Sequence, residues 1–241
     1  MGEFFNLDNK WVQGLGKLVD CVCLSLIWLA CCLPAGMTFY VAWQSPTVVW
    51  GWLICWVLSI LIGPATTALY YTVNKVIRHN RGYIWREFWH AFKTNFKQSA
   101  IVGLIMFALC LFFWLDCYIM YQFAQAGEQS GSLYVVFIVF IALALAWGCY
   151  LFPYIARFEN TTKQAVKNAG LIALANLPWT VVVLVLLCAV CLAVYVMPLA
   201  AFIAPAFYMI VVNYILEKIF KKYMSEEDIA AEEERNQEFY N

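Results

Sequence analysis

The sequence has little charge. Only 12% of its 241 residues are Asp, Glu, Lys or Arg, whereas 64% are hydrophobic and the mean hydropathy is +0.73. A soluble domain is closer to a quarter charged and half apolar, so this composition excludes an ordinary soluble protein and indicates an integral membrane protein. The apolar runs are too long for barrel strands, which alternate over about ten residues. We therefore expect an all-α, polytopic membrane helical bundle.

Six apolar runs are long enough to cross a bilayer, which takes roughly 20 residues per helix. They cover residues 18–42, 48–73, 99–122, 133–156, 177–197 and 199–217. Only Pro198 separates the last two runs, which form either a hairpin or one broken helix, and their combined length favours the hairpin. Close helix packing is expected where small residues recur, as at Ala144 and Gly148. The sequence thus predicts one transmembrane domain over residues 1–224, and the length of its first run predicts a retained anchor rather than a cleaved signal peptide.

Basic residues are missing from one set of loops. If there are six crossings, the loops near Gln44–Pro46, at 123–132 and at Pro198 face one side, and none contains Lys or Arg. All 15 basic residues fall on the other side: Lys10, Lys17, Lys75, Arg78, Arg81, Arg86, Lys93, Lys97, Arg157, Lys163, Lys167, Lys218, Lys221, Lys222 and Arg235. The positive-inside bias then places both termini in the cytoplasm. The end of the chain, residues 225–241, carries seven acids against one Arg and is predicted to be an acidic cytoplasmic tail.

The longest cytoplasmic loop contains a segment that is both basic and aromatic. Its rings recur at helical spacing along one face, and its cations take other faces. We expect an amphipathic helix over about 84–97, either lying in the membrane interface or docking on a partner. Nucleic-acid binding is not expected of so short, membrane-tethered a loop. The candidate interface residues here are Trp85, Arg86, Phe88, Trp89, Phe92, Lys93 and Phe96.

Motifs for catalysis or for cofactor binding are also missing. The ten cysteines all lie in apolar runs, including the pair Cys188 and Cys191, where packing is the expected role. The two histidines, His79 and His90, lack the further ligands that a zinc site needs. No nucleophile elbow, metalloprotease motif or phosphate-binding glycine loop occurs. We therefore expect a non-enzymatic protein without metal or cofactor.

Two acids fall inside apolar runs. Asp20 lies near the inner end of the first run, where it could pair with Lys17 or cap a helix. Asp116 lies about 26 Å into the third run by helical rise, and the outer side supplies no cation for it. An acid there must be hydrated, neutral or hydrogen-bonded, and a polar outward cavity is one possible reason for its presence.

A third polar group ends the fourth run at the inner surface. It consists of Arg157, Glu159 and Asn160. Arg157 is expected either to snorkel to the interface or to pair with an acid such as Glu217. The group is also a candidate docking surface.

Several motifs resemble a known family when they are taken in order. They are "MGEFFNLDNK" (1–10), "CCLPAG" (31–36), "PATTALYYTVNKVIR" (64–78), "GYIWREFWHAFKTNFKQS" (82–99), "PYIARFENTTKQAVKNA" (153–169) and "ANLPWT" (175–180). Together they resemble the YesL-like family of bacterial membrane proteins, a domain of unknown function. The resemblance extends to about Tyr223, and it implies a multi-pass protein of the bacterial plasma membrane with no established catalytic residues to carry over.

The resemblance also implies a setting. Members tend to be encoded beside ABC-type carbohydrate importers, which suggests an accessory or interacting subunit of carbohydrate import, with the bilayer and a permease or ATPase subunit as partners. The chain is not expected to be the permease, because "KQAVKNAGLIALANLPWT" lacks the leading Glu-Ala-Ala of the loop that docks the ATPase. A small-solute transporter or channel with a polar path past Asp116 is the alternative.

Overall fold

The computed structural model describes residues 10–45, 49–79, 82–224, 226 and 229. Every regular element in this part of the chain is helical, which confirms the predicted all-α class. The acidic tail lies outside the described residues apart from 226 and 229. The α-helices in order are α1 (Lys10–Gln44), α2 (Val49–Leu58), α3 (Ile62–Thr72), α4 (Ile84–Gln125), α5 (Tyr134–Arg157), α6 (Thr162–Ala175), α7 (Leu177–Val196) and α8 (Ala204–Lys221).

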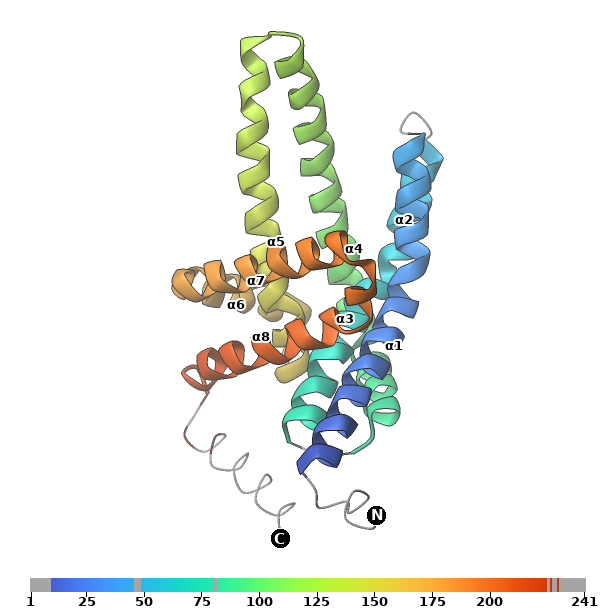
Figure 1. Cartoon of the computed structure of the whole chain (residues 1–241). Coiled ribbons are helices and arrows are strands. Elements are labelled where there is room, and N and C mark those ends of the chain that lie inside the picture. Colours follow the sequence, from blue (N-terminus) through green and yellow to red (C-terminus); the bar gives the residue numbers. More distant parts are fainter. Residues whose placement is uncertain (1–9, 46–48, 80–81, 225, 227–228, 230–241) are drawn as a thin grey trace.

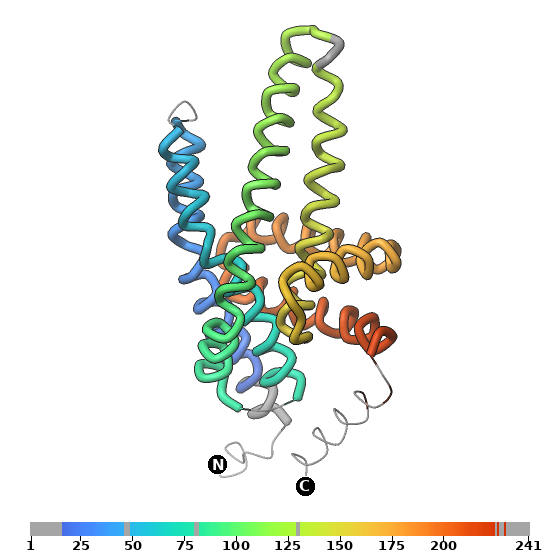
Figure 2. Tube along the Cα trace, turned by 180° about the vertical axis from the view of Figure 1, so that it is seen from behind, coloured from blue at the N-terminus to red at the C-terminus, as the bar shows by residue number. Residues whose placement is uncertain are grey.

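Two upright hairpins dominate the molecule. One is formed by α1 with α2 and α3, and the other by the long helices α4 and α5 (Figures 1 and 2). Among the residues that the structure describes, five helical segments are long and apolar enough to cross a bilayer: Gly16–Gln44, Val49–Arg78, Ile84–Gln125, Gly131–Arg157 and Leu177–Val196. Since a helix satisfies its own backbone hydrogen bonds, it is the form that such runs take in lipid. The chain is therefore a membrane protein built as a helical bundle.

The second apolar run is one helical column with two irregular turns. A 3₁₀ turn, η2 (Ser59–Leu61), separates α2 from α3, and a π-helical turn, η3 (Val73–Arg78), extends α3. Pro64 lies near the start of α3 and lacks the N–H that a continuous helix would need, which accounts for the first irregularity. The π-helical turn forms the lower end of this column in Figure 1, and its sequence includes the polar residues Asn74, Lys75 and Arg78.

Small residues let α3 and α4 pack closely. Gly63 and Gly103 face each other across the contact, so that a Cβ added to Gly103 would lie 3.1 Å from Cα of Gly63. Beside them, the buried hydroxyls of Thr67 and Ser99 are 2.9 Å apart and share a hydrogen bond. Backbones approach in this way where no side chain separates them. This crossing fixes the two upright hairpins to each other.

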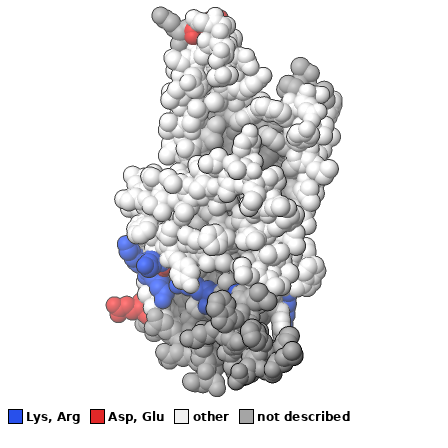
Figure 3. All heavy atoms as spheres, viewed as in Figure 1, with Lys and Arg blue, Asp and Glu red and all other residues white. Residues whose placement is uncertain are grey.

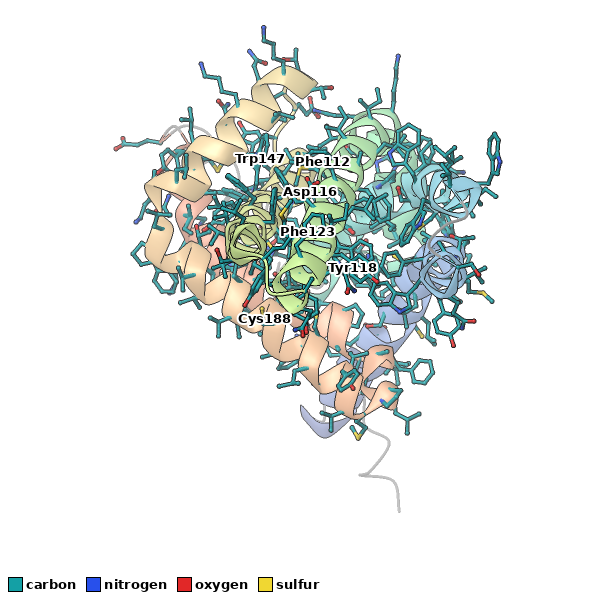
Figure 4. All side chains as sticks on the ribbon, turned by 90° about the horizontal axis from the view of Figure 1, so that it is seen from above. Phe112, Asp116, Tyr118, Phe123, Trp147 and Cys188 are labelled. Atoms are coloured by element: carbon teal, nitrogen blue, oxygen red, sulfur yellow. The ribbon has the colours of Figure 1, made fainter. Side chains whose placement is uncertain are left out.

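The last two apolar runs form the predicted hairpin, but it does not stand upright. A 3₁₀ turn, η5 (Pro198–Phe202), joins α7 to α8, and both helices run across the α4–α5 hairpin instead of along it (Figures 1 and 4). The turn is held by Ser25 of α1, whose Oγ donates to the Ile203 carbonyl (3.3 Å) and accepts from the Ala206 N–H (3.1 Å). By helical rise, Ser25 lies about 12 Å from Lys17 and about 29 Å from Gln44. The closed end of the hairpin therefore stays well short of the far end of α1.

This arrangement bears on the number of crossings. Helix α8 carries Glu217, Lys218 and Lys221 within its 18 residues, and it is not among the segments apolar enough to span. The prediction of six crossings therefore stays a prediction, and the structure orients the last pair differently from the first four.

Charge divides the molecule into layers. In Figure 3 the visible Lys and Arg form a band across the lower part, and the surface above it is white up to acidic atoms at the tip of the α4–α5 hairpin. Helix α5 has no charged residue before Arg157 and is about 36 Å long by helical rise, close to the roughly 30 Å of a bilayer's hydrocarbon core. We call the uncharged part the apolar slab and the part with the band the basic end.

Helix α4 differs from its prediction. The sequence predicts an amphipathic helix at 84–97 that is separate from the span at 99–122, but both belong to one helix of 42 residues, Ile84–Gln125. Neither proline nor glycine interrupts the junction around Lys97–Ser99, so nothing in the local sequence ends the first helix. The amphipathic segment is thus an upright extension of the span and does not lie flat in the interface.

Candidate functional site at the basic end

A carboxylate is buried at the basic end. Glu217 of α8 is 3% exposed, and its Oε1 accepts hydrogen bonds from the Tyr70 hydroxyl (3.0 Å) and from Nδ2 of Asn74 (3.3 Å). The guanidinium of Arg157, at the end of α5, lies with its Nε 3.4 Å from the same oxygen. A buried charge without such partners would cost several kcal/mol. The predicted pairing of Arg157 with Glu217 is confirmed.

One turn earlier on α8, a second cation is held close by. Arg78, at the end of the π-helical turn, donates from NH1 to Oδ1 of Asn213 (2.9 Å), and its guanidinium lies 5.0 Å from the ring centre of Tyr214. Asn213 is 1% exposed and precedes Glu217 by four residues, so both project from one face of α8. These contacts join the α3 column, α5 and α8 into one polar network, and π-helical turns recur at such functional places.

Most of this network is missing from the sequence prediction. Tyr70, Asn74 and Arg78 follow one another at intervals of four residues, and Asn213 and Glu217 repeat that interval in an apolar run. Polar residues at helical spacing inside an apolar run were the signal that could have found them. What the sequence does not reveal is that the two rows face each other.

An open pocket of about 1110 Å³ lies beside the network. Arg157 belongs to both, since its guanidinium bonds Glu217 and its side chain lines the pocket. The pocket lies between the end of α5, the segment 158–161, α6 and the residues after α8. Its lining is Tyr154, Arg157, Phe158, Glu159, Asn160, Asn168, Leu171, Ile172, Ala175, Tyr223 and Met224. The predicted group Arg157, Glu159 and Asn160 is thus brought together at one concave surface.

The inner wall of this pocket is fixed by hydrogen bonds. The Tyr154 hydroxyl accepts from Nδ2 of Asn160 (2.9 Å) and from Nδ2 of Asn168 (3.0 Å). Asn176, which precedes α7, donates from Nδ2 to the Tyr223 hydroxyl (3.1 Å) and so ties the start of α7 to the end of α8. Glu159 and Leu171, by contrast, are exposed at the rim. The pocket therefore combines a rigid wall with a rim that is open to a partner.

Helix α6, which forms one side of the pocket, begins with a capping box. The Thr161 hydroxyl accepts from the Gln164 N–H, and the Gln164 side chain accepts in return from the Thr161 N–H. Two backbone donors at the helix start are satisfied in this way. The segment between the fourth and fifth predicted runs is therefore mostly helix, since α6 covers Thr162–Ala175 and only 158–161 is extended or irregular.

The predicted aromatic face of 84–97 is largely core. Phe88 is 0% and Phe92 9% exposed, and Trp89 and Phe96 pack against the same core. Of these five rings, only Trp85 is exposed, at 64%. Five aromatic side chains on one stripe do identify a buried face, but the sequence cannot tell a lipid or partner surface from a core that α3 supplies. As a docking face of five rings, the prediction is wrong.

The charged residues around that segment are likewise partly exposed and partly buried. Arg86 and Lys93 are exposed as predicted, whereas Glu87 is 8% exposed and its Oε2 is 2.7 Å from Nζ of Lys75. Gly82 has a φ of +80°, and a Cβ there would lie 2.7 Å from Oε1 of Glu87. The turn before α4 is thus closed over an ion pair, which favours glycine at this position.

The two intramembrane acids stand apart from this site. Asp20 is the eleventh residue of α1, so it does not cap that helix, and the described residues include no Lys17–Asp20 ion pair. Asp116 is half-buried on α4. It lines neither the pocket beside the Arg157–Glu217 pair nor a second cavity, which lies inside the apolar slab. Figure 4 shows Asp116 and Tyr118 on different sides of α4, with Tyr118 toward α1 and α2.

Cysteines and other metal-ligating groups form no cluster in the described part of the chain. No set of three His, Cys, Asp or Glu side chains is arranged there to hold a metal ion. Cys188 and Cys191 are both exposed on the apolar surface of α7. Their exposure puts them on the outside of the bundle, so the packing role expected of them stays a prediction.

Comparison with known proteins finds similarity to proteins of unknown function. Residues 21–117 match a family model described as "Protein of unknown function, DUF624". "Uncharacterized protein YteU" of Bacillus subtilis (strain 168) is 23% identical over 141 residues, which is 55% of this chain and 62% of that protein's length. No solved structure matches. The match to this family model over residues 21–117 confirms the resemblance to YesL-like proteins that the motifs indicate.

Proposed function

We propose that this protein is a non-enzymatic accessory subunit of a bacterial plasma-membrane complex, with both termini inside the cell. Its partner would be a permease or ATPase subunit of an ABC-type carbohydrate importer, a setting that comes from the family resemblance. The basic end would face the cytoplasm, as the positive-inside bias favours.

The observation that carries this proposal is the pocket beside the Arg157–Glu217 pair. A docking surface needs a shape that is fixed before the partner arrives, because ordering mobile groups costs affinity. The Tyr154 and Glu217 hydrogen bonds supply that fixed shape, and Glu159 and Leu171 provide an exposed charge and an exposed apolar side chain at the rim. A partner segment with a basic residue next to an apolar one would match this rim.

The transporter alternative is less well supported. It was built on a polar path past Asp116, and Asp116 lines neither described cavity. The cavity inside the apolar slab is walled almost wholly by apolar side chains, which suits no sugar. We keep this alternative as an outcome of the experiment below.

The test is affinity purification of the tagged full-length protein from its own membranes in mild detergent, followed by mass spectrometry. Glu159→Lys reverses the charge at the pocket rim, and Lys93→Glu is the matched reversal at an exposed site on α4. We expect wild type and Lys93→Glu to recover importer subunits. Glu159→Lys should recover at least tenfold less of these subunits than wild type.

Each other result contradicts part of the proposal. Loss with Lys93→Glu alone would move the docking surface to α4. Recovery of no importer subunit by any variant, together with solute flux by the purified protein in proteoliposomes, would replace the accessory role with transport.

A further inference from the structure

A second cavity lies inside the apolar slab, and its lining is apolar, unlike that of the pocket at the basic end. Its volume is about 730 Å³, and its walls come from α1, α3, α4, α5, α7 and α8. One lining residue from each of these helices, in the same order, is Trp28, Gly63, Met106, Gly148, Val194 and Tyr208. In Figure 3 the surface is recessed between the two upright hairpins, above α7. Ala144 and Gly148, where the sequence predicts close helix packing, line this space.

The few polar groups in the walls already have partners within the protein. Nε1 of Trp28 donates to Oγ1 of Thr66 (3.2 Å), which itself donates to a carbonyl of its own helix (2.8 Å). The Ser59 hydroxyl donates to a carbonyl three residues earlier (2.6 Å), and the Tyr208 hydroxyl lies 3.4 Å from Sγ of Cys149. Because these groups are satisfied by the walls, the cavity offers an occupant almost no hydrogen bond.

Such a cavity excludes water and is unfavourable when it is empty. Water enters cavities that offer it two or more polar partners, and it stays out of apolar ones. Apolar walls that face an empty space lose the van der Waals contacts that an apolar occupant would give them. Leu145 and Cys191, which line the cavity, are also exposed on the outer surface, so the space is open sideways toward the bilayer.

We propose that an acyl chain of a membrane lipid occupies this cavity. A flexible hydrocarbon chain needs no hydrogen bonds and can enter from the side. Acyl chains are also the most abundant groups in the hydrocarbon core of the bilayer, where the apolar slab lies. A partner helix does not fit, because a helix about 10 Å wide would fill a volume of this size with roughly 9 Å of its length, about six residues. The site is independent of the polar pocket and of the proposed accessory role.

The test uses the full-length protein in vesicles of phosphatidylglycerol doped with the same lipid carrying a diazirine midway along one acyl chain. After illumination, mass spectrometry locates the lipid adducts on the peptides. Gly148→Leu fills the cavity: a Cβ at Gly148 meets the Met106 methyl at 3.6 Å, an ordinary contact, so the backbone can stay in place. Gly36→Leu is the matched control, since a Cβ at Gly36 has no atom within 4 Å.

We expect adducts on cavity-lining residues of α5 and α8, reduced at least fivefold by Gly148→Leu and unchanged by Gly36→Leu. Val194→Phe, from the opposite wall, provides a second filling variant and should reduce the same adducts if Gly148→Leu does not fold. Adducts confined to outward-facing residues such as Val135 and Ile138, or cavity adducts that survive both filling variants, would overturn the proposal. So would inter-protein cross-links through Cys191 in place of lipid adducts, because a second copy of the chain would then occupy the space.

Discussion

Glu217 carries its charge among groups from two segments that are far from it in the chain. Tyr70 and Asn74 come from the α3 column, and Arg157 comes from the end of α5. Removing one member of a buried pair costs more than removing both, because the remaining charge keeps its desolvation cost without compensation. This asymmetry makes the network testable at a single residue.

We predict that Glu217→Gln lowers the free energy of unfolding by about 3 kcal/mol. The substitution keeps the shape of the side chain and leaves the Arg157 guanidinium without its carboxylate. Adding Arg157→Met removes the stranded charge, and the double variant should recover at least half of the loss. Thermal unfolding midpoints of the three variants in one detergent would measure this. A double variant that is as unstable as the sum of the two single ones would show that the pair is not coupled.

Helix α4 carries the second prediction, at the scale of an element. Phe88→Ala should lower the free energy of unfolding by about 3 kcal/mol, the usual cost of emptying a buried aromatic site. Trp85→Ala, three residues earlier on the same helix but 64% exposed, should stay within about 0.5 kcal/mol of wild type. The comparison of their unfolding midpoints separates a core face from a docking face. Equal and small effects would restore the docking face that the sequence predicts.

The elements themselves were largely predictable. The first four apolar runs, 18–42, 48–73, 99–122 and 133–156, each fall within a helical segment, apart from residue 48, which lies outside the described residues. Hydrophobic run length determines such elements because the bilayer core has one thickness. The extension of α4 down to Ile84 was missed because a helix continues wherever nothing stops it, and the sequence was divided by hydropathy alone.

The site was only partly predictable, for a different reason. A pair of Arg157 with an acid such as Glu217 was one of two alternatives for Arg157, because both are charges at the edge of an apolar run, where opposite charges tend to pair. Phe88 was misplaced because it is buried in a core that other helices help to build, and nothing in the sequence next to Phe88 shows this. Tyr154 and Asn168 were missed because both are ordinary residues that become a site only when α5 and α6 meet.

The whole molecule poses a question about threading through the membrane. Asn176 and Tyr223 hold the open end of the α7–α8 hairpin together, and Ser25 holds its closed end about 12 Å along α1 from Lys17. The hairpin therefore enters the apolar slab and returns without reaching its far side. Four full crossings with such a hairpin keep both termini on one side, as six crossings would.

The third prediction distinguishes these two arrangements. In a cysteine-free background, Leu199→Cys at the hairpin turn should react with an impermeant maleimide from neither side of the membrane. Glu128→Cys, at the tip of the α4–α5 hairpin, should be labelled on intact cells, and Lys222→Cys only after permeabilisation. Labelling of Leu199→Cys on intact cells would mean that α7 and α8 do cross, and the hairpin would then stand upright in the bilayer.

The unbroken α4 has a mechanical consequence. Its 42 residues contain no proline and span about 63 Å, roughly twice the hydrocarbon thickness of a membrane. Helices bend sharply only at prolines, π-turns or similar interruptions, so α4 is one stiff rod held near its middle where Gly63 meets Gly103. Its length joins the basic end of the molecule directly to the tip of the α4–α5 hairpin, and a displacement of one end would be transmitted along the helix to the other.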